Sequence, residues 1–298
     1  MEQVENAIKE FMGQSVTMVN PEDEFGFKCQ QCGSCCTNRR DILLNPFDIY
    51  NGAKYLGIKP EEFLLQFTYS ELGHTLKIPI VLLKPANNGF CPLLELDFKD
   101  GCKFKCKIHP AKPGACANHP IGVAFSKNIA TGEEEMSFIK VEQCPNSVST
   151  EMHKVSDWTK DYMDNLEDIK AAHEVQMAVR EIMDPEEFVK TLALIGILYE
   201  NETVTTPALG LTIKESVTQV LDTYALATVH LGYGEYDINR PFAEQAKENI
   251  VKLKEIYTDM NKFYINVKEK LEQTTGKTID EHIEALKNIL MNANNEED

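Results

Sequence analysis

The cysteine residues of this chain have a spacing that suits metal chemistry. Four of the nine cysteines lie within eight residues of the 298-residue sequence, as Cys29-Gln30-Gln31-Cys32-Gly33-Ser34-Cys35-Cys36. A disulfide joins two cysteines at one particular separation, whereas a thiophilic metal draws several thiolates toward one point. In a C-x-x-C turn the backbone N–H groups point at the thiolates and lower their basicity. The run therefore predicts a metal site with soft ligands.

The remaining cysteines lie further along the chain and can complete such a site. Three ligands at C-x-x-C-x-x-C spacing, with a fourth from a distant segment, suit tetrahedral zinc or the corners of an iron–sulfur cube. The spacing alone does not choose between the two. The later cysteines are Cys91, which precedes Pro92, then Cys102, Cys106 and Cys116, and finally Cys144, which precedes Pro145.

The order of these motifs resembles the YkgJ-like cysteine-cluster family, which is described as zinc- or iron-chelating. The family pattern is C-x-x-C-x-x-C-C, a C-P, a C-x-I-[Tyr or His]-x-x-Arg-P-x-x-C-R-x-aromatic-P block and a final C-P. In this chain the block runs from Cys106 to Pro120, and the resemblance covers roughly residues 27 to 145. It implies eight metal-ligating cysteines, namely Cys29, Cys32, Cys35, Cys36, Cys91, Cys106, Cys116 and Cys144.

The chain departs from the family pattern at three positions. Lys112 stands where the family has Arg, Ala117 replaces the Arg after the cysteine, and His119 occupies the aromatic position. If the family arginines position an anionic ligand, this protein handles that ligand differently or not at all. Cys102 is extra to the pattern, and we interpret it as a spare thiol rather than a ligand.

Two histidines follow cysteines closely enough to share a metal. His109 lies three residues after Cys106, and His119 lies three residues after Cys116. Imidazole is a good ligand for zinc or iron. The alternative is that each ring packs or donates a hydrogen bond beside the site. By contrast, His153, His173 and His230 have no ligand partner at a useful spacing, and we expect them to be structural or surface residues. We expect the single tryptophan, Trp158, to lie in the core rather than to stack on a cofactor.

Eight thiolates exceed the needs of one mononuclear site. They could complete two four-ligand sites, or one such site with structural or redox cysteines beside it. Their combined negative charge needs compensation, which a metal supplies. We prefer an iron–sulfur cluster of the [4Fe–4S] type, with Zn²⁺ as the second choice.

Some members of the family that this chain resembles are labelled flagellin lysine N-methylase. The resemblance therefore implies a protein-modifying enzyme that uses S-adenosylmethionine. The alternative is a non-catalytic zinc- or iron-binding or metal-delivery module, whose helical half binds a protein partner. The chain has no Gly-rich strand-to-helix loop followed by an acidic residue, the arrangement that cradles a nucleoside in Rossmann-type methyltransferases. Gly232-x-Gly234 alone is too weak to count.

The composition describes an ordinary globular protein of acidic character. Hydrophobic residues make up 43% of the chain and charged residues 26%, and the net charge is −17. Binding to a nucleic acid backbone depends on Lys and Arg, so this charge argues against a nucleic acid partner. The N-terminus lacks the pattern of a signal peptide, and the longest apolar stretch, near residues 192–199, is too short to cross a bilayer. We expect a cytoplasmic protein, in which thiols stay reduced.

The first half of the sequence alternates short helices with extended segments. We expect helices over residues 2–12 and 46–56, the second with Asn45 as N-cap and Gly57 as its end. A further helix begins at Pro60, and residues 78–83 look extended. A turn is expected at Lys99-Asp100-Gly101, and the apolar runs 121–125 and 136–141 flank Thr131-Gly132 as a β-hairpin.

The second half is helical in pattern. We expect a long amphipathic stretch over about 150–183 and a helix from Pro185 to Tyr199 with Asp184 as N-cap. Thr212 with Glu215, and Thr278 with Glu281, fit the capping box. Apolar residues from Ala243 to Leu271 recur every three or four positions, which predicts one stripe of a long helix. We interpret this stripe as the inner face of a bundle in preference to a dimer seam.

These patterns predict an α+β fold with two domains. Residues 1–148 would form a cysteine-rich domain organised by metal, and residues 149–298 a mostly α-helical domain. We expect a monomer, while the sequence leaves the oligomeric state open.

Overall fold

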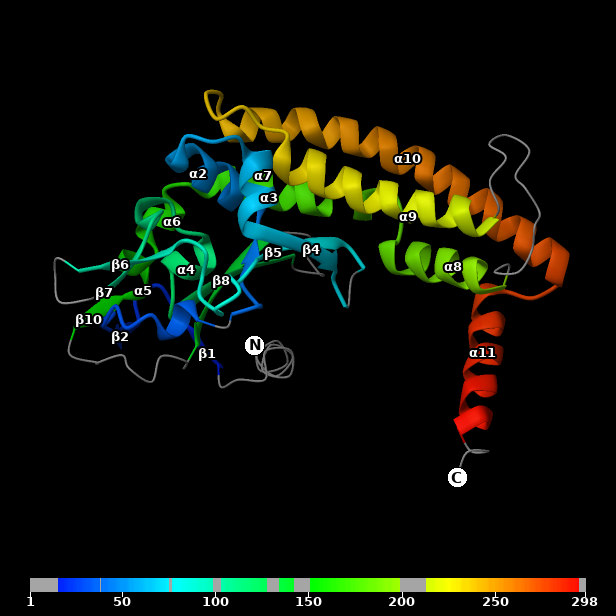
Figure 1. The fold of residues 1–298 in the computed structure, drawn as a ribbon, viewed down its shortest axis with the longest axis horizontal. Coiled ribbons are helices and arrows are strands. Elements are labelled where there is room, and N and C mark those ends of the chain that lie inside the picture. The colour runs from blue at the N-terminus through cyan, green and yellow to red at the C-terminus, as the bar shows by residue number, and fades with distance from the viewer. Residues whose placement is uncertain are drawn as a thin grey trace.

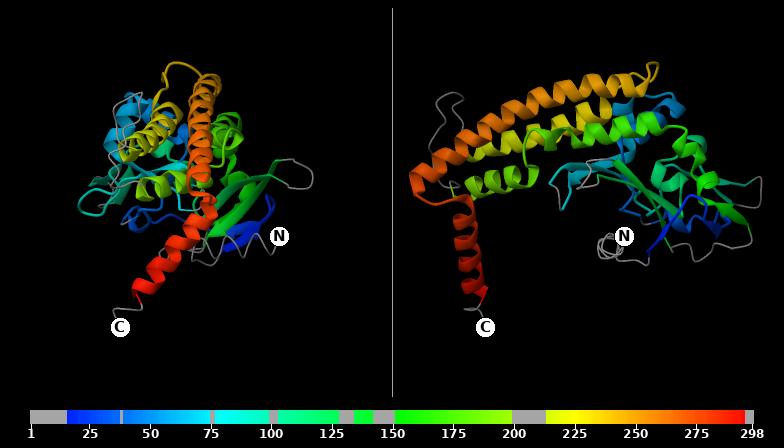
Figure 2. Two further views of the ribbon diagram at one scale, coloured as in Figure 1. Left: turned by 90° about the vertical axis from the view of Figure 1, so that its right-hand side faces the viewer. Right: turned by 180° about the vertical axis from the view of Figure 1, so that it is seen from behind.

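The computed structural model describes residues 16–37, 39–74, 77–98, 103–127, 134–141, 151–198 and 213–294. Strands and short helices gather at one end of the molecule, and long helices extend away from them (Figure 1). Seen from behind, the last helix turns sharply away from the axis of the long helices (Figure 2). The fold is α+β, with a strand-rich N-terminal region and a helical C-terminal region, as the sequence predicts.

The described strands form small antiparallel sheets. Strands β8 (Ile121–Lys127) and β9 (Glu134–Val141) pair antiparallel, as the predicted hairpin requires, while its turn at Thr131-Gly132 lies outside the described residues. Strand β5 (Pro79–Leu83) confirms the predicted extended segment. Because each sheet has only two or three strands, the segments between them hold the N-terminal region together. The sheets are β1 (Val16–Val19) with β9 (Glu134–Val141) and β8 (Ile121–Lys127); β2 (Glu24–Gly26) with β10 (Met152–Lys154); β3 (Leu43–Leu44) with β5 (Pro79–Leu83) and β4 (Thr68–Leu72); and β6 (Leu94–Asp97) with β7 (Lys103–Cys106).

Helix α2 (Pro46–Leu56) confirms the predicted start and end. Asn45 accepts a hydrogen bond from the Asp48 N–H, and the Asp48 carboxylate accepts one from the Asn45 N–H, which completes a capping box. Gly57 ends the helix in the left-handed conformation, at φ 69°. Helix α3 (Pro60–Phe67) begins at Pro60 as predicted and buries Phe63.

The prediction of one long amphipathic stretch over residues 150–183 is wrong. Residues 152–154 pair with β2 as strand β10, and the chain then turns at Thr159 and at Asn165. Pairing with β2 is a tertiary contact that a helical periodicity does not reveal. The helical pieces are α5 (Val155–Trp158), α6 (Lys160–Met163), α7 (Leu166–Met177) and the 3₁₀ turn η3 (Ala178–Glu181).

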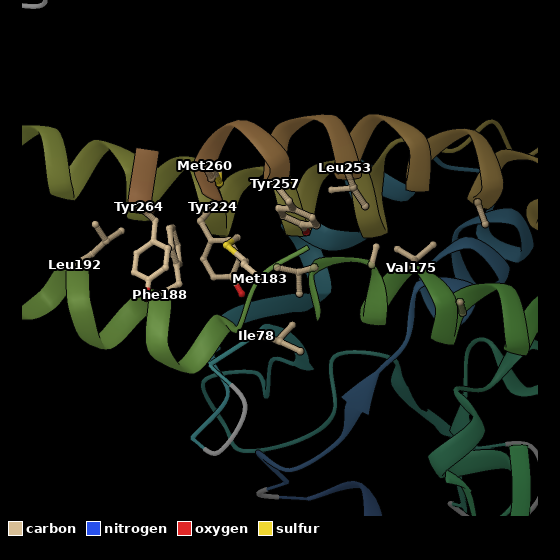
Figure 3. Packing of buried hydrophobic residues seen from close by; sticks show 14 of the residues in the cluster. Ile78, Val175, Met183, Phe188, Leu192, Tyr224, Leu253, Tyr257, Met260 and Tyr264 are labelled. Atoms are coloured by element: carbon tan, nitrogen blue, oxygen red, sulfur yellow. The ribbon is translucent and has the colours of Figure 1, made fainter. Parts of the chain in front are cut away.

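Long helices of the C-terminal region pack into a bundle around aromatic residues (Figure 3). The Phe188 ring lies 5.4 Å from the Tyr224 ring and 5.9 Å from the Tyr264 ring, between centroids. The predicted apolar stripe of the longest helix is buried in this core, which confirms the interpretation as the inner face of a bundle. The helices are α7, α8 (Pro185–Leu198), α9 (Ile213–Val229) and α10 (Phe242–Thr275).

The predicted caps of two helices are present. Asp184 accepts hydrogen bonds from the N–H groups of Glu186 and Glu187 at the start of α8. Thr278 and Glu281 form the expected capping box at the start of α11 (Ile279–Asn294). Thr212, Tyr199, Lys99 and the segment 2–12 lie outside the described residues. Among the described helices, none combines the length and apolar content that a membrane span needs.

The two halves of the chain share their cores. The Tyr50 hydroxyl of α2 donates to the Arg240 carbonyl at 2.7 Å, and the Tyr224 hydroxyl of α9 donates to the Lys77 carbonyl at 3.0 Å. Tyr233, in the π-helical turn η4 (His230–Gly234), is buried in the core formed by α2, α3 and β5. The boundary predicted near residue 148 lies outside the described residues and stays a prediction.

Candidate metal centre

Two left-handed residues shape the loop from Cys29 to Cys36. Gln31 has φ 52° and Gly33 has φ 75°, and the 3₁₀ turn η1 (Ser34–Cys36) follows. A Cβ atom on Gly33 would lie 2.8 Å from Cδ2 of Phe104, so both the backbone angle and the close ring favour glycine. Left-handed turns of this kind direct N–H groups toward an anionic group. The loop is therefore suited to hold thiolates.

Backbone hydrogen bonds attach this loop to the segment that contains β6 and β7. The Phe104 N–H donates to the Gln31 carbonyl at 3.1 Å, and the Cys91 N–H donates to the Cys36 carbonyl at 2.8 Å. In the β6–β7 hairpin Leu94 pairs with Cys106. The fold thus brings Cys36, Cys91 and Cys106 together, although they are far apart in sequence.

Asp48 connects helix α2 to the segment that carries Cys116. Cys116 lies on the short helix α4 (Gly114–Ala117), and the Gly114 N–H donates to Oδ1 of Asp48 at 2.9 Å. The Asn45 N–H donates to Oδ2 of the same carboxylate at 2.9 Å. Asp48 is buried, and this burial raises its pKa to about 6, although the two hydrogen bonds act in the opposite direction. The cap of α2 therefore also fixes Cys116.

Five cysteines from these segments form a group that we call the inner cluster. The Sγ atoms of Cys35 and Cys36 are 3.8 Å apart. Cys36 interacts electrostatically with Cys91 and Cys116, and Cys106 interacts with both of these residues. The thiols of Cys91, Cys106 and Cys116 pack against the apolar core around α2 and β5. The inner cluster consists of Cys35, Cys36, Cys91, Cys106 and Cys116.

The environment of the inner cluster opposes the joint ionisation of its thiols. Burial raises the pKa of Cys91 and Cys106 and raises that of Cys116 to about 12. A hydrogen bond between Cys35 and Cys36 lowers the pKa of Cys35 to about 6 and raises that of Cys36 above its ordinary value. Most of these thiols therefore stay protonated at neutral pH unless a positive charge enters among them.

Two basic side chains lie beside the inner cluster. Arg39 interacts electrostatically with Cys35 and Cys116, and Lys112 interacts with Cys35 and Cys106. Asp41 holds the Arg39 guanidinium through two hydrogen bonds, of 2.6 and 2.9 Å. Lys112 is the position at which the chain departs from the family arginine, so a positive charge is retained there.

Of the other predicted ligands, two are exposed and one lies outside the described residues. Cys29 and Cys32 are exposed, and the Cys32 thiol donates to Oγ of Ser34 at 3.3 Å. Cys144 and the extra Cys102 lie outside the described residues. The described interactions thus connect five of the eight predicted ligands, and one of these five, Cys35, is exposed like the first C-x-x-C pair.

Thiols dominate the donor set of the inner cluster, which fits zinc or an iron–sulfur cluster. Within the described ranges, no three His, Cys, Asp or Glu side chains already close around one point as metal ligands. The thiols are therefore neighbours whose side chains must rotate to coordinate one ion or cluster.

The histidines lie in different surroundings. His109 is exposed, whereas Nε2 of His119 is buried and has no hydrogen-bond partner. Nε2 of His153 lies 2.8 Å from the Phe27 carbonyl, and its ring centroid is 4.6 Å from that of Trp158. These last two side chains pack together beside β2, as expected for structural residues.

The sequence analysis missed Asp48 and Arg39. Asp48 was readable in part, because an acidic residue at the third helical position after an Asn cap is typical of a capping box. Its bond to Gly114 is a contact between segments 66 residues apart, which no local pattern reveals. Arg39 follows Cys36 by three residues, and this spacing is the signal that could have identified it.

Comparison with known proteins assigns this region to a family. Residues 28–145 match the family model CxxCxxCC, described as "Putative zinc- or iron-chelating domain". Neither the curated proteins nor the solved structures gave a match. The match spans the inner cluster, Cys29, Cys32 and the final C-P motif, and it supports metal binding. The family model that residues 28–145 match is therefore the family that the cysteine pattern resembles.

Proposed function

We propose that this protein binds an iron–sulfur cluster of the [4Fe–4S] type through the inner cluster, with Zn²⁺ as the alternative occupant. The observation that carries this proposal is that three thiols from separate segments, Cys91, Cys106 and Cys116, pack against one apolar core, and that Cys35 and Cys36 interact electrostatically with members of this group. Four thiolates are the ligands that either a cubane or a structural zinc ion needs. Loading supplies the positive charge that lets these buried thiols ionise.

We assign the remaining cysteines to a second or flanking role. Cys29, Cys32 and Cys144, with the fifth thiol of the inner cluster, make up the eight predicted ligands. Cys29 and Cys32 are exposed, so they are accessible to an incoming metal. In this proposal the protein binds metal through Cys29, Cys32, Cys35, Cys36, Cys91, Cys106, Cys116 and Cys144, with the deepest site at Cys116.

Anaerobic purification followed by absorption spectroscopy and by metal and sulfide analysis tests the proposal. An iron–sulfur cluster gives broad charge-transfer absorption near about 400 nm and stoichiometric acid-labile sulfide. A colourless protein with stoichiometric zinc would contradict the cubane and support the alternative. A protein that retains neither metal, and that takes up neither when reconstituted, would contradict metal binding altogether.

For the activity, we propose modification of a protein substrate, of the lysine N-methylase type, with S-adenosylmethionine as the methyl donor. The lysine methylases that this chain resembles also have a cysteine region followed by a helical region. In this chain the two regions pack against each other through Tyr50 and Tyr224. The competing proposal is a metal-binding or metal-delivery module whose helical half binds a protein partner. Both proposals place a protein, not a nucleic acid, against this chain.

Addition of S-adenosylmethionine to the anaerobically loaded protein separates the two proposals. An enzyme that binds this cosubstrate at an open position of the cluster should show a change in the cluster spectrum. A module with protein ligands at every metal should show no change. The same preparation can be incubated with lysine-containing protein substrates and analysed for methylation by mass spectrometry.

A further inference from the structure

The two histidines that share one spacing from a cysteine differ in a way that bears on the metal centre. His109 follows Cys106 by three residues and is exposed, whereas His119 follows Cys116 by three residues and is half-buried. Nε2 of His119 is buried and has no hydrogen-bond partner. The sequence treats the two residues alike, and the structure distinguishes them.

A buried nitrogen without a partner indicates a missing contact. Almost all buried polar atoms in native proteins have a hydrogen-bond partner, and the exceptions often mark a ligand, an ion or a water. The hydrogen-bond capacity of His119 Nε2 is therefore available to a group that the protein binds.

The ring of His119 contacts the segment that leads into the first cysteine run, and His119 shares a basic neighbour with Cys116. Its ring packs edge-on against Phe27, with centroids 5.8 Å apart and an interplanar angle of 79°. Phe27 lies two residues before Cys29, and Cys116 lies three residues before His119, so this ring contact joins two segments that carry predicted ligands. The Arg39 guanidinium interacts electrostatically with His119 and also with Cys116.

We propose that His119 is a positioning residue of the metal centre, and that its Nε2–H donates a hydrogen bond to a metal-bound thiolate. This inference rests on the proposed metal-binding function. A thiolate bound to a metal carries negative charge and accepts N–H hydrogen bonds, and such contacts orient the ligand and reduce the charge on sulfur. No carbonyl or carboxylate competes for Nε2 among the described atoms.

Competition with a chromophoric chelator under reducing conditions, with Zn²⁺ as the probe, tests the proposal. His119→Phe keeps an aromatic ring against Phe27 and removes the donor, whereas His119→Gln keeps an N–H near the same place. We expect His119→Phe to weaken zinc affinity about 10-fold, as loss of a contact to a metal ligand typically does. His119→Gln should lose less, and His109→Phe, the matched control, should stay within about twofold of the wild type.

A second measurement uses the wild type and does not depend on the folding of a variant. In ¹⁵N NMR spectra of the histidine rings, addition of Zn²⁺ should shift the Nε2 signal of His119 while that nitrogen stays protonated. The ring of His109 should be unaffected. A zinc affinity of His119→Phe within about twofold of the wild type, or an Nε2 signal of His119 that zinc leaves unchanged, would overturn the proposal. Loss of the proton with direct zinc coordination would also overturn it.

The outcomes separate this inference from the proposed function. If the wild type binds no zinc, the proposed function fails for this metal. If the wild type binds zinc and all three variants bind it equally, only the assignment of His119 fails. Circular dichroism and denaturant midpoints of the metal-free variants show whether any loss of affinity comes from unfolding.

Discussion

Replacement of Asp48 by Asn tests which of two opposing effects controls the pKa of the carboxylate that connects helix α2 to the segment of Cys116. Burial opposes the charged form of Asp48, whereas hydrogen bonds from the Asn45 and Gly114 N–H groups favour it. Burial is the larger effect and raises the pKa from 3.8 to about 6 in the folded protein. The folded state therefore retains a proton on Asp48 at pH values where the unfolded chain has lost it.

The sign and size of the effect follow from proton linkage. Because the folded protein binds more protons between pH 4 and 6, the stability contributed by Asp48 is greatest at low pH and decreases as the pH rises. A pKa difference of about 2 units corresponds to about 3 kcal/mol over the whole range. Between pH 4 and 7 we expect the free energy of unfolding of the wild type to fall by about 2–3 kcal/mol relative to Asp48→Asn.

Urea unfolding of the metal-free, reduced proteins at several pH values between 4 and 7 measures this difference. Glu61→Gln is a suitable control because Glu61 is an exposed carboxylate in the first turn of α3. Its difference from the wild type should vary by less than about 0.5 kcal/mol over the same range. A stability difference between wild type and Asp48→Asn that moves in the opposite direction would show that the hydrogen bonds win over burial and would refute the reasoning.

Three further predictions concern the loop and the metal. Gly33→Ala should destabilise the protein more than Gly57→Ala. Both residues have positive φ, which costs about 1–2 kcal/mol for alanine, but only Gly33 has a ring within 3 Å of the new Cβ. Equal denaturant midpoints for the two variants would contradict the close contact. Cys116→Ser should lower metal affinity more than Cys29→Ser, since only Cys116 belongs to the inner cluster. Equal losses of metal affinity in chelator competition would count against that cluster as the main site. Saturation with Zn²⁺ at about 100 times Kd should stabilise the wild type by about 2.7 kcal/mol, and thermal unfolding with and without EDTA measures this gain.

Local chemistry made several elements of the fold predictable. Asn45 and Gly57 mark the two ends of α2, and Thr278 with Glu281 marks the start of α11. These ends were predictable because caps are formed by residues three or four positions apart. The apolar stripe of α10 was equally readable, since burial repeats with the period of the helix. The structure of segment 150–183 was not predictable from local patterns, because β10 pairs with β2, more than 120 residues away.

The candidate site was predictable in its residue types and less so in its arrangement. The cysteine spacing predicted thiol ligands, and all five members of the inner cluster are among the predicted residues. Spacing did not reveal that Cys29 and Cys32 remain exposed while Cys91, Cys106 and Cys116 pack against an apolar core. Nor did it separate His109 from His119, because their difference lies in which neighbours cover each ring.

The sequence by itself determined the class of the fold and the thiol-rich composition of the candidate site, since residue type, capping residues and apolar periodicity are properties of residues close together along the chain. Only the tertiary structure decided which thiols become neighbours, and it did so through the Cys91–Cys36 backbone hydrogen bond, the β6–β7 register and the bond from Gly114 to Asp48. These contacts join segments far apart in sequence, and their formation depends on the packing of the whole chain rather than on any local pattern.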